Sequence, residues 1–421
     1  MTVTDATARF GNVVLRGPQS KVARDRPGKI PLNGVRGEYP SHRGGVDGIS
    51  RTSRRNEAKA ARIAGVGSAM PKHRFPQEAI TAMLKGFWRG KLQNPDLLER
   101  FHSRMGVDYR HLAFPLERYA QFTSWGETNA AWLEAAEELG ARAIDEALDH
   151  AGMSRYDLNA LFVVSITGIA SPSLDARLIN RMRLRRDIKR TPIFGIGCAG
   201  GAIGLSRATD YTLAYPGHNA AILAVELCSL TLQSDDLSTA NQIAAGLFGD
   251  GAVAAVVAGS ETAANHPPIS SRACGIAGPQ ILDCNSVFYP DSEDVMGWDI
   301  SENGFKIVLS PRLPEVIREN LAGDVDAFLA RHELSRADVG NWVIHTGGPK
   351  VLEAIQGTLE LHDRDLERSW DCLKRFGNLS SASVLLVLED VVTNHRPAPG
   401  TYGVLLAMGP GFCSEMILVQ W

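Results

Sequence analysis

Hydrophobic and polar positions follow a regular pattern from Arg62 onward. The stretch RIAGVGSAMP, which begins at Arg62, alternates as a half-buried strand does and ends at a proline. Segments with helical spacing and short apolar runs then follow one another to Trp421 at the C-terminus. This alternation of strands and helices predicts an α/β fold.

Residues 1–61 lack such a pattern. They are rich in Gly, Pro, Ser and Arg, and they contain 12 Lys and Arg but 5 Asp and Glu. A chain of this composition buries too little apolar surface to fold, so we predict a basic, disordered N-terminal extension over 1–61. Its charge excess is scattered, as in a solvated tail, and we expect no nucleic-acid partner.

One segment of the pattern occurs twice. LDHAGMSRYDLNALFVVSITG (Leu148–Gly168) and LARHELSRADVGNWVIHTGG (Leu329–Gly348) share a helix end, an S-R-x-D turn and an apolar strand that runs into a loop. When the two serines are aligned, Val164 falls on His345. The repeat predicts two similar halves, each with a strand that delivers residues to the carboxyl edge of a sheet.

These features divide the chain into three parts. We expect the extension over 1–61, an N-terminal half over 62–265 and a C-terminal half over 266–421.

The overall composition is that of a soluble protein, with 44% apolar residues, 22% charged residues and a net charge of −3. No apolar run reaches the ~18–20 residues of a membrane span, and the N-terminus lacks the apolar core of a secretory signal. We therefore expect a cytoplasmic protein with no membrane span. The six cysteines form no CxxC pair, so we expect neither a disulfide framework nor a metal site.

Cys198 is the first residue with candidate chemistry. In TPIFGIGCAGGAIGLSRA it follows an apolar run, predicted to be a buried strand over Thr191–Gly197, and it begins a predicted helix. Unpaired N–H groups at a helix N-terminus favour a thiolate, which would make Cys198 a nucleophile. A buried core cysteine is the alternative, and this segment by itself leaves both open.

Two further segments supply possible partners. In NWVIHTGGPKVLEAI, His345 ends a strand and a helix begins near Pro349, so the ring projects from the carboxyl edge of the sheet as a base or cation would. In RFGNLSSASVLLVLED, Asn378 or Ser380 can cap the following helix, and the Asn378 amide could also donate to a developing oxyanion. A structural histidine and a simple cap are the alternatives.

Five ordered motifs, GIGCAGG, LFGDGAVAAVV, IHTGGPKV, FGNLSSAS and the terminal GPGF, together resemble the type III polyketide synthases, the chalcone synthase-like branch of the thiolase superfamily. The resemblance covers Arg62 to Trp421 and is closest to bacterial members. It implies a layered α-β-α-β-α thiolase fold of two pseudo-repeated halves, a homodimer, and acyl-CoA and malonyl-CoA as substrates, with no metal or organic cofactor.

The resemblance also implies catalytic roles. Cys198 would accept the acyl group of a starter. His345 and Asn378 would bind the thioester carbonyl of malonyl-CoA and stabilise the enolate formed on decarboxylation, and His345 would hold Cys198 as a thiolate. The family commonly has a proline after this histidine, where this chain has Thr346.

Other positions match family roles less directly, and each could be an ordinary core or surface residue. Phe248 and Phe305 match the gatekeeper pair between the coenzyme tunnel and the cavity. The remaining matches are cavity residues Thr231, Ser171, Gly197 and Gly297, the cyclisation loop Gly409, Pro410, Gly411 and Phe412, and coenzyme A contacts Arg100, Arg104 and Lys350.

The substrate is predicted from small residues at the cavity positions, which leave room for an aliphatic chain. We expect a medium- or long-chain acyl-CoA starter and an alkyl α-pyrone or alkylresorcinol product. The main alternative is malonyl-CoA alone, giving tetrahydroxynaphthalene or a phloroglucinol. An initiating ketoacyl-carrier-protein synthase normally has His-Gln-Ala-Asn where this chain has HTGGP.

Two remaining alternatives are less well supported by the sequence. A hydroxymethylglutaryl-CoA synthase needs a catalytic glutamate, but Glu226 is expected within a strand and not over Cys198. A non-catalytic acyl-CoA-binding homologue would not need the three residues Cys198, His345 and Asn378.

Overall fold

The computed structural model describes residues 60–263 and 278–421, which belong to one unit, 51–421. The extension predicted over 1–61 lies outside the described residues except for its last two, and β1 begins at Ala61. Among the described helices, none is long and apolar enough to cross a membrane.

The strands have the following bounds: β1 Ala61–Ala69, β2 His73–Pro76, β3 Tyr109–Leu112, β4 Leu158–Val164, β5 Lys189–Ile193, β6 Asn219–Leu227, β7 Asp250–Ala258, β8 Gln280–Phe288, β9 Met296–Ser301, β10 Gly304–Leu309, β11 Val339–Ile344, β12 Tyr402–Gly409 and β13 Cys413–Gln420.

The α-helices have the following bounds: α1 Gln77–Phe87, α2 Pro95–Ser103, α3 Leu116–Tyr119, α4 Trp125–Ala151, α5 Leu174–Met182, α6 Gly200–Ala214, α7 Thr239–Leu247, α8 Ser260–Ala263, α9 Leu313–Ala330, α10 Pro349–Leu359, α11 Asp363–Phe376 and α12 Ser383–Asn394. The short 3₁₀ helices are η1 Arg155–Asp157, η2 Gly197–Ala199, η3 Cys228–Thr231, η4 Arg336–Asp338 and η5 Ser380–Ala382.

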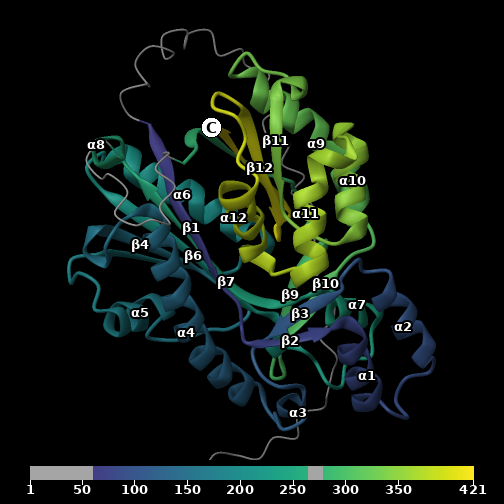
Figure 1. Ribbon diagram of the computed structural model, residues 1–421. Helices are drawn as coiled ribbons and strands as arrows, with labels where there is room; N and C mark the ends of the chain where they lie inside the picture. The colour runs from purple at the N-terminus through teal and green to yellow at the C-terminus, as the bar shows by residue number, and fades with distance from the viewer. Residues whose placement is uncertain (1–59, 264–277) are drawn as a thin grey trace, which may run out of the picture. The chain divides into compact units, whose positions relative to one another are not determined.

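Nine strands of the described residues form one sheet in the order β11-β12-β13-β8-β1-β7-β6-β4-β5 (Figure 1). Its two halves meet where β1 pairs with β8 through Ala61–Ile281 and Arg62–Gln280. Strand β4 runs parallel to β5 and β6, and β11 runs parallel to β12. Loops after β4 and β11 therefore leave the sheet at the carboxyl ends of parallel strands, where α/β proteins commonly place their sites.

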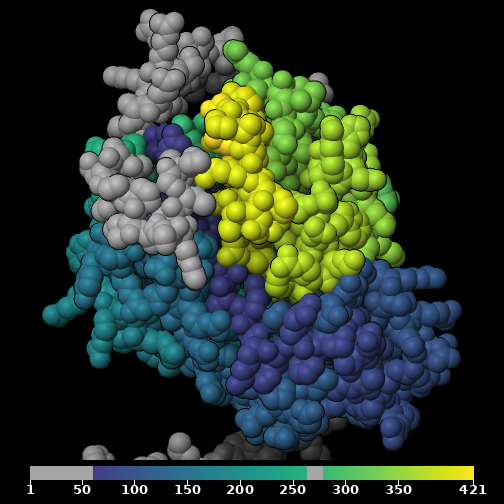
Figure 2. All heavy atoms as spheres, in the orientation of Figure 1, coloured from purple at the N-terminus to yellow at the C-terminus, as the bar shows by residue number. Residues whose placement is uncertain are grey.

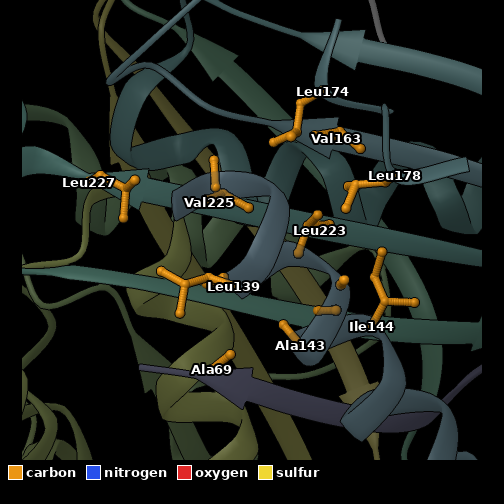
Figure 3. Packing of buried hydrophobic residues seen from close by; sticks show 14 of the residues in the cluster. Ala69, Leu139, Ala143, Ile144, Val163, Leu174, Leu178, Leu223, Val225 and Leu227 are labelled. Carbon is orange, nitrogen blue, oxygen red and sulfur yellow. The ribbon is translucent and has the colours of Figure 1, made fainter. Parts of the chain in front are cut away.

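The helices form layers on the sheet. In β4, Phe162 and Val164 face a core shared with α6 and α12, whereas Leu161 and Val163 face the core under α4 and α5, as the period of two in a strand requires. Figure 3 shows the second of these cores, in which Leu139 and Ile144 lie with strand residues such as Leu223. A third core lies under α9 and α10. The predicted layered thiolase-like α/β fold is confirmed.

The repeat predicted from the sequence is visible in detail. Ser154 and Ser335 each make a reciprocal capping box with the aspartate three residues later, ahead of η1 and η4. Each turn also carries an arginine paired with an aspartate ten residues before it: Arg155 with Asp145 and Arg336 with Asp326. Strands β4 and β11 then begin, and β11 ends one residue before His345.

The buried strand predicted over Thr191–Gly197 is wrong in its end and in its burial. Strand β5 ends at Ile193 and is an exposed edge strand, not a buried one. Pro192 has no N–H to give to a further strand, which suits an edge position. The apolar residues after Ile193 form the loop that leads into η2.

The segment from β2 to β3 lies against the C-terminal half. The N–H of Asp108 donates to the carbonyl of Lys374 in α11 over 2.8 Å. In Figure 2 this blue and purple segment borders the yellow-green surface of the C-terminal half. This contact brings β3, with Arg110, next to the residues that follow α11.

Candidate active site

Cys198 lies where the two halves meet. It is the middle residue of η2, and α6 begins two residues later. A Cβ on Gly409 of β12 would lie 2.7 Å from the backbone nitrogen of Ala199, and one on Gly201 would lie 2.2 Å from the carbonyl oxygen of Ser381. Glycine is therefore needed at both places, because the C-terminal half packs directly on the backbone around Cys198.

The Cys198 thiol is buried, and its sulfur lies 3.6 Å from the Ser380 hydroxyl oxygen. Burial raises the pKa of this thiol to about 12, while hydrogen bonds from the side chains of Ser380 and Asn378 act in the opposite direction. The Asn378 side chain thus influences the candidate nucleophile, and its predicted role as an oxyanion donor stays a prediction.

Asn378 is fixed by both its backbone and its side chain. Its Oδ1 accepts from the N–H of Ser380 over 2.7 Å, which fixes the turn before η5. The predicted cap of the long helix by Asn378 or Ser380 is wrong, because α12 has Ala382 at its N-cap and no side-chain cap hydrogen bond. Its backbone pairs with the end of α7 as a parallel bridge to Phe248. Gly377 has φ of +75°, and a Cβ there would lie 2.6 Å from the carbonyl oxygen of Leu247. A glycine is therefore required before Asn378.

His345 follows β11 directly, and its N–H donates to the carbonyl of Leu406 in β12 over 2.9 Å. This pairing places His345 beside the last residues of β12, the strand whose Gly409 packs against Ala199 of η2. The ring is 5% exposed, and neither of its nitrogens has a hydrogen-bond partner among the described residues. Buried polar atoms are nearly always bonded, so an unpaired buried imidazole is suited to binding a substrate oxygen.

Burial favours the neutral form of both Cys198 and His345. Burial lowers the pKa of His345 to about 3 and raises that of Cys198 to about 12, so each group alone is neutral near pH 7. A buried charge is stable only when it is paired. The predicted thiolate–imidazolium pair can therefore form only if the thiol proton passes to His345, which creates both charges together.

A cavity lies beside Phe248. Most of its wall is apolar and comes from α1, β3 and α7, while Thr231, Tyr119 and Ser229 supply hydroxyls. Two of the predicted residues, Phe248 and Thr231, are thus brought together at one cavity. The backbone of Phe248 is bridged to that of Asn378, so one residue of this cavity's wall is joined directly to a candidate catalytic residue.

Phe305 lines a neighbouring hollow, which Thr231 also lines. Its ring is buried against Trp125 and Trp298. The two predicted gatekeepers therefore line adjacent spaces that share Thr231.

Three predicted cavity residues line neither of these two spaces. Gly297 lies in β9, next to the cavity residue Trp298, and Ser171 is exposed in the loop between β4 and α5. Gly197 is part of η2, and a Cβ there would lie 2.6 Å from Pro410. Their cavity roles stay predictions.

The predicted cyclisation loop connects β12 to β13, as the sequence indicates. Gly409 ends β12, and Pro410 and Gly411 form the turn. The Phe412 side chain is buried, and its N–H donates to the Ser292 hydroxyl. Pro410 touches the turn that carries Cys198, so this loop is part of the site's wall and not only a tight turn.

The predicted coenzyme A contacts lie on the surface. Arg104, Arg100 and Lys350 are all exposed. A Cβ on Gly106 would lie 3.8 Å from Pro349, which places the chain after Arg104 beside the chain before Lys350. The phosphate-binding role of these residues stays a prediction.

Two buried residues at the cavity were not predicted as site residues from the sequence, and a third, Glu226, was predicted only to lie within a strand. Cys228 and Arg110 line the cavity beside Phe248. Glu226 lies within β6, as expected, and accepts hydrogen bonds from the side chains of Ser381 and Thr167. Burial raises the pKa of Glu226 to about 7. No local motif marks these residues, because their partners are distant in sequence.

Comparisons with known proteins agree with this geometry. The family model for the N-terminal domain of chalcone and stilbene synthases matches residues 49–262, and the model for the C-terminal domain matches 280–421. A 1,3,6,8-tetrahydroxynaphthalene synthase from Streptomyces peucetius subsp. caesius is 48% identical over 359 residues, which cover 85% of this chain and 93% of that protein.

Solved structures show the same similarity. The 1,3,6,8-tetrahydroxynaphthalene synthase from Streptomyces coelicolor A3(2), a bacterial type III polyketide synthase, matches with a TM-score of 0.76 and 29% identity over 86% of this chain and 99% of that one. PKS-I from the brown alga Ectocarpus siliculosus matches with a TM-score of 0.77 and 29% identity over 86% of this chain and 98% of that one.

Proposed function

The chain belongs to the chalcone and stilbene synthase family and is an acyltransferase of the bacterial type III polyketide synthase kind, and we propose that malonyl-CoA alone serves as its starter and extender. The proposed product is an oxygen-rich aromatic of the tetrahydroxynaphthalene type. The 48% identity to a tetrahydroxynaphthalene synthase is the observation that carries this choice of starter.

The first step of the proposed mechanism loads the starter. The Cys198 proton passes to His345, and the thiolate attacks the thioester carbonyl of the starter. The C–S bond to coenzyme A breaks, and coenzyme A leaves as a thiol after taking up the proton. Cys198 then carries the acyl group as a thioester, which keeps the carbonyl reactive.

The second step forms the carbon–carbon bond. A malonyl-CoA binds with its thioester oxygen near the His345 ring and the Asn378 amide. Loss of carbon dioxide leaves the electron pair of the broken bond on an enolate, whose oxygen both donors stabilise. The enolate carbon attacks the Cys198 thioester, the C–S bond breaks, and the thiolate is released. The lengthened chain, now a coenzyme A thioester, returns to Cys198 for the next extension.

A medium- or long-chain aliphatic starter is the second candidate. Its support is the apolar part of the cavity beside Phe248, where Leu84, Leu112 and Leu232 contribute to the wall. An alkyl chain in this space would gain about 25 cal/mol per Å² of apolar surface removed from water. It would leave the buried polar groups of the same cavity without partners.

One incubation series distinguishes the two candidates. Malonyl-CoA is incubated alone and with acyl-CoAs of increasing chain length, and the products are identified by mass spectrometry. We expect an aromatic product from malonyl-CoA alone. An enzyme that forms nothing from malonyl-CoA alone, yet extends long acyl chains to pyrones or resorcinols, would overturn the proposed starter.

The homodimer is also part of the proposal, supported by the family resemblance. Light scattering after gel filtration should give twice the 45.5 kDa of one chain. A mass of one chain at micromolar concentration would contradict it.

A further inference from the structure

The carboxyl end of α7 is held by two buried polar side chains from the N-terminal segment. Nε2 of Gln77 donates to the carbonyl of Gly246 over 2.7 Å. Nη1 of Arg110, in β3, donates to the carbonyls of Ala245 and Phe248 over 2.7 and 2.8 Å. The last carbonyls of a helix have no partner within the helix, and its negative end favours a cation, so Arg110 has a clear structural role.

The hydrogen bonds to α7 engage only some of the N–H donors of the Arg110 guanidinium group. Arginine has five N–H donors. Nε of Arg110 donates to Oε1 of Gln77 over 3.1 Å, and Nη1 serves the two carbonyls. Nη2 has no hydrogen-bond partner among the described residues, although the residue is 2% exposed. A buried donor without a partner costs about 1–3 kcal/mol, and more when it is charged.

No carboxylate of the described residues forms an ion pair with Arg110. The charge of Asp250 acts on Arg110, but the Asp250 oxygens accept from the N–H of Ala113 and from the N–H and hydroxyl of Ser229. Burial lowers the pKa of Arg110 to about 10, and the charges of Asp250, Tyr119 and Cys228 oppose this. Arg110 therefore remains a cation at neutral pH.

The same side chain lines the cavity beside Phe248. Of the described residues in that wall, Arg110 is the one cation, and Tyr119 and Thr231 contribute hydroxyls nearby. The carbonyl that Arg110 holds belongs to Phe248, which is bridged to Asn378. The side chain that carries the unpaired donor thus lines the cavity, and it holds a residue that is bridged to Asn378.

We propose that Nη2 of Arg110 binds a negatively charged oxygen of the acyl chain on Cys198, namely the carboxylate of a malonyl starter or an enolate oxygen of the growing β-keto chain, and so determines which chains the cavity accepts. This inference rests on the proposed malonyl starter. Such a chain presents an oxygen at every second carbon, whereas an alkyl chain would leave the cation buried and unpaired.

The test compares chain growth with decarboxylation in purified enzyme supplied with malonyl-CoA alone. Decarboxylation needs His345 and Asn378, whereas chain growth also needs the cavity. In Arg110→Met we expect the yield of aromatic product per carbon dioxide released to fall by about 10- to 100-fold, the range for losing a hydrogen bond to a charged group. Arg110→Lys should recover most of this yield, because it keeps the charge.

A matched control isolates the structural role of Arg110. His102 is also buried and bonds the carbonyl of Gln242 in α7, but it does not line the cavity. His102→Leu should lower both rates together and leave the ratio of product to carbon dioxide unchanged. Arg110→Gln keeps a donor and loses the charge, so it repeats the test if the methionine variant fails to fold.

Three outcomes decide the matter. A fall in the ratio for the neutral Arg110 variants, with the His102 ratio unchanged, supports the inference. An unchanged ratio in Arg110→Met or Arg110→Gln, or an equal fall in His102→Leu, overturns it. A wild-type enzyme that releases carbon dioxide but makes no product from malonyl-CoA alone overturns the proposed starter itself, before any variant is measured.

Discussion

The two halves of the molecule contain the same turn and strand but carry different chemistry. In the first half, β4 ends at Val164, and the hydroxyl of Thr167 beyond it is bonded to Glu226. In the second half, β11 leads to His345, whose ring has no partner among the described residues. The repeated features form the same local structure in each half, whereas the residues at the strand ends differ, and we assign the chemistry to the second of them.

The central helices differ in a similar way. Helix α6 is preceded by Cys198, and α12 is preceded by the Asn378 segment. Each half therefore supplies one part of a site that neither half contains alone.

The largest expected effect is the loss of polyketide formation when the nucleophile is removed. Cys198→Ala should abolish polyketide formation, because no thioester can form. Cys198→Gln, which resembles a loaded thioester, should retain malonyl decarboxylation. Carbon dioxide release and product are measured side by side, with Cys372→Ala, an equally buried cysteine in α11, as the control. Condensation that persists in Cys198→Ala would refute the assignment.

The second effect concerns the oxyanion donors. His345→Ala and Asn378→Ala should each slow decarboxylation by about 100- to 1000-fold, the typical loss for one such donor. Val164 occupies the matching place at the end of β4, so Val164→Ala is the paired control. It should cost about 0.5–3 kcal/mol of stability without changing the rate per folded molecule. Equal rate losses at both strand ends would contradict the division of roles.

The third expected effect is a pH dependence of the protein's stability, and it comes from Glu226 in the N-terminal half. Burial raises the pKa of Glu226 from 4.5 to about 7. Between these values the folded protein keeps a proton that the unfolded chain has released, so stability falls as pH rises. Wild type should therefore lose about 3 kcal/mol relative to Glu226→Gln across this window. Denaturant unfolding at several pH values measures it, and a difference that does not vary with pH would exclude the shift.

The smallest expected effect is a loss of stability when the capping box of either repeated turn is removed. Asp157→Ala and Asp338→Ala should each cost about 1 kcal/mol, because each removes one capping box. The two losses should be equal and additive, since the sites are far apart. Unfolding midpoints measure them, and turnover per folded molecule should not change. A loss of turnover at one cap alone would show that the repeat is not purely structural.

The sequence predicted those parts of the fold that rest on local patterns. Strand β1, the His345 position before α10 and the terminal β12–β13 pair all follow from short-range periodicity and turn residues. The exposure of β5 did not follow, because an apolar run does not show whether a strand lies at an edge. Its position depends on the order of the whole sheet.

The candidate site was predictable where a motif carried it. Cys198 precedes α6, and Asn378 precedes η5 and α12, which are the places that the motifs indicated. Arg110 was not predictable, because its meaning comes from Gln77 and Phe248, which are 33 and 138 residues away along the chain. The choice of starter also changed, from an aliphatic chain to malonyl-CoA, and this remains a prediction.

The central claim is that the acyl chain is held on Cys198 and on no other thiol. Cys228 is the sharpest rival, because it is also buried and it lines the cavity beside Phe248. The direct measurement is peptide mass spectrometry of enzyme quenched during turnover with malonyl-CoA. We predict acyl mass on the peptide that contains Cys198 and none on the peptide that contains Cys228. Acyl mass on Cys228, with Cys198 unmodified, would contradict the account.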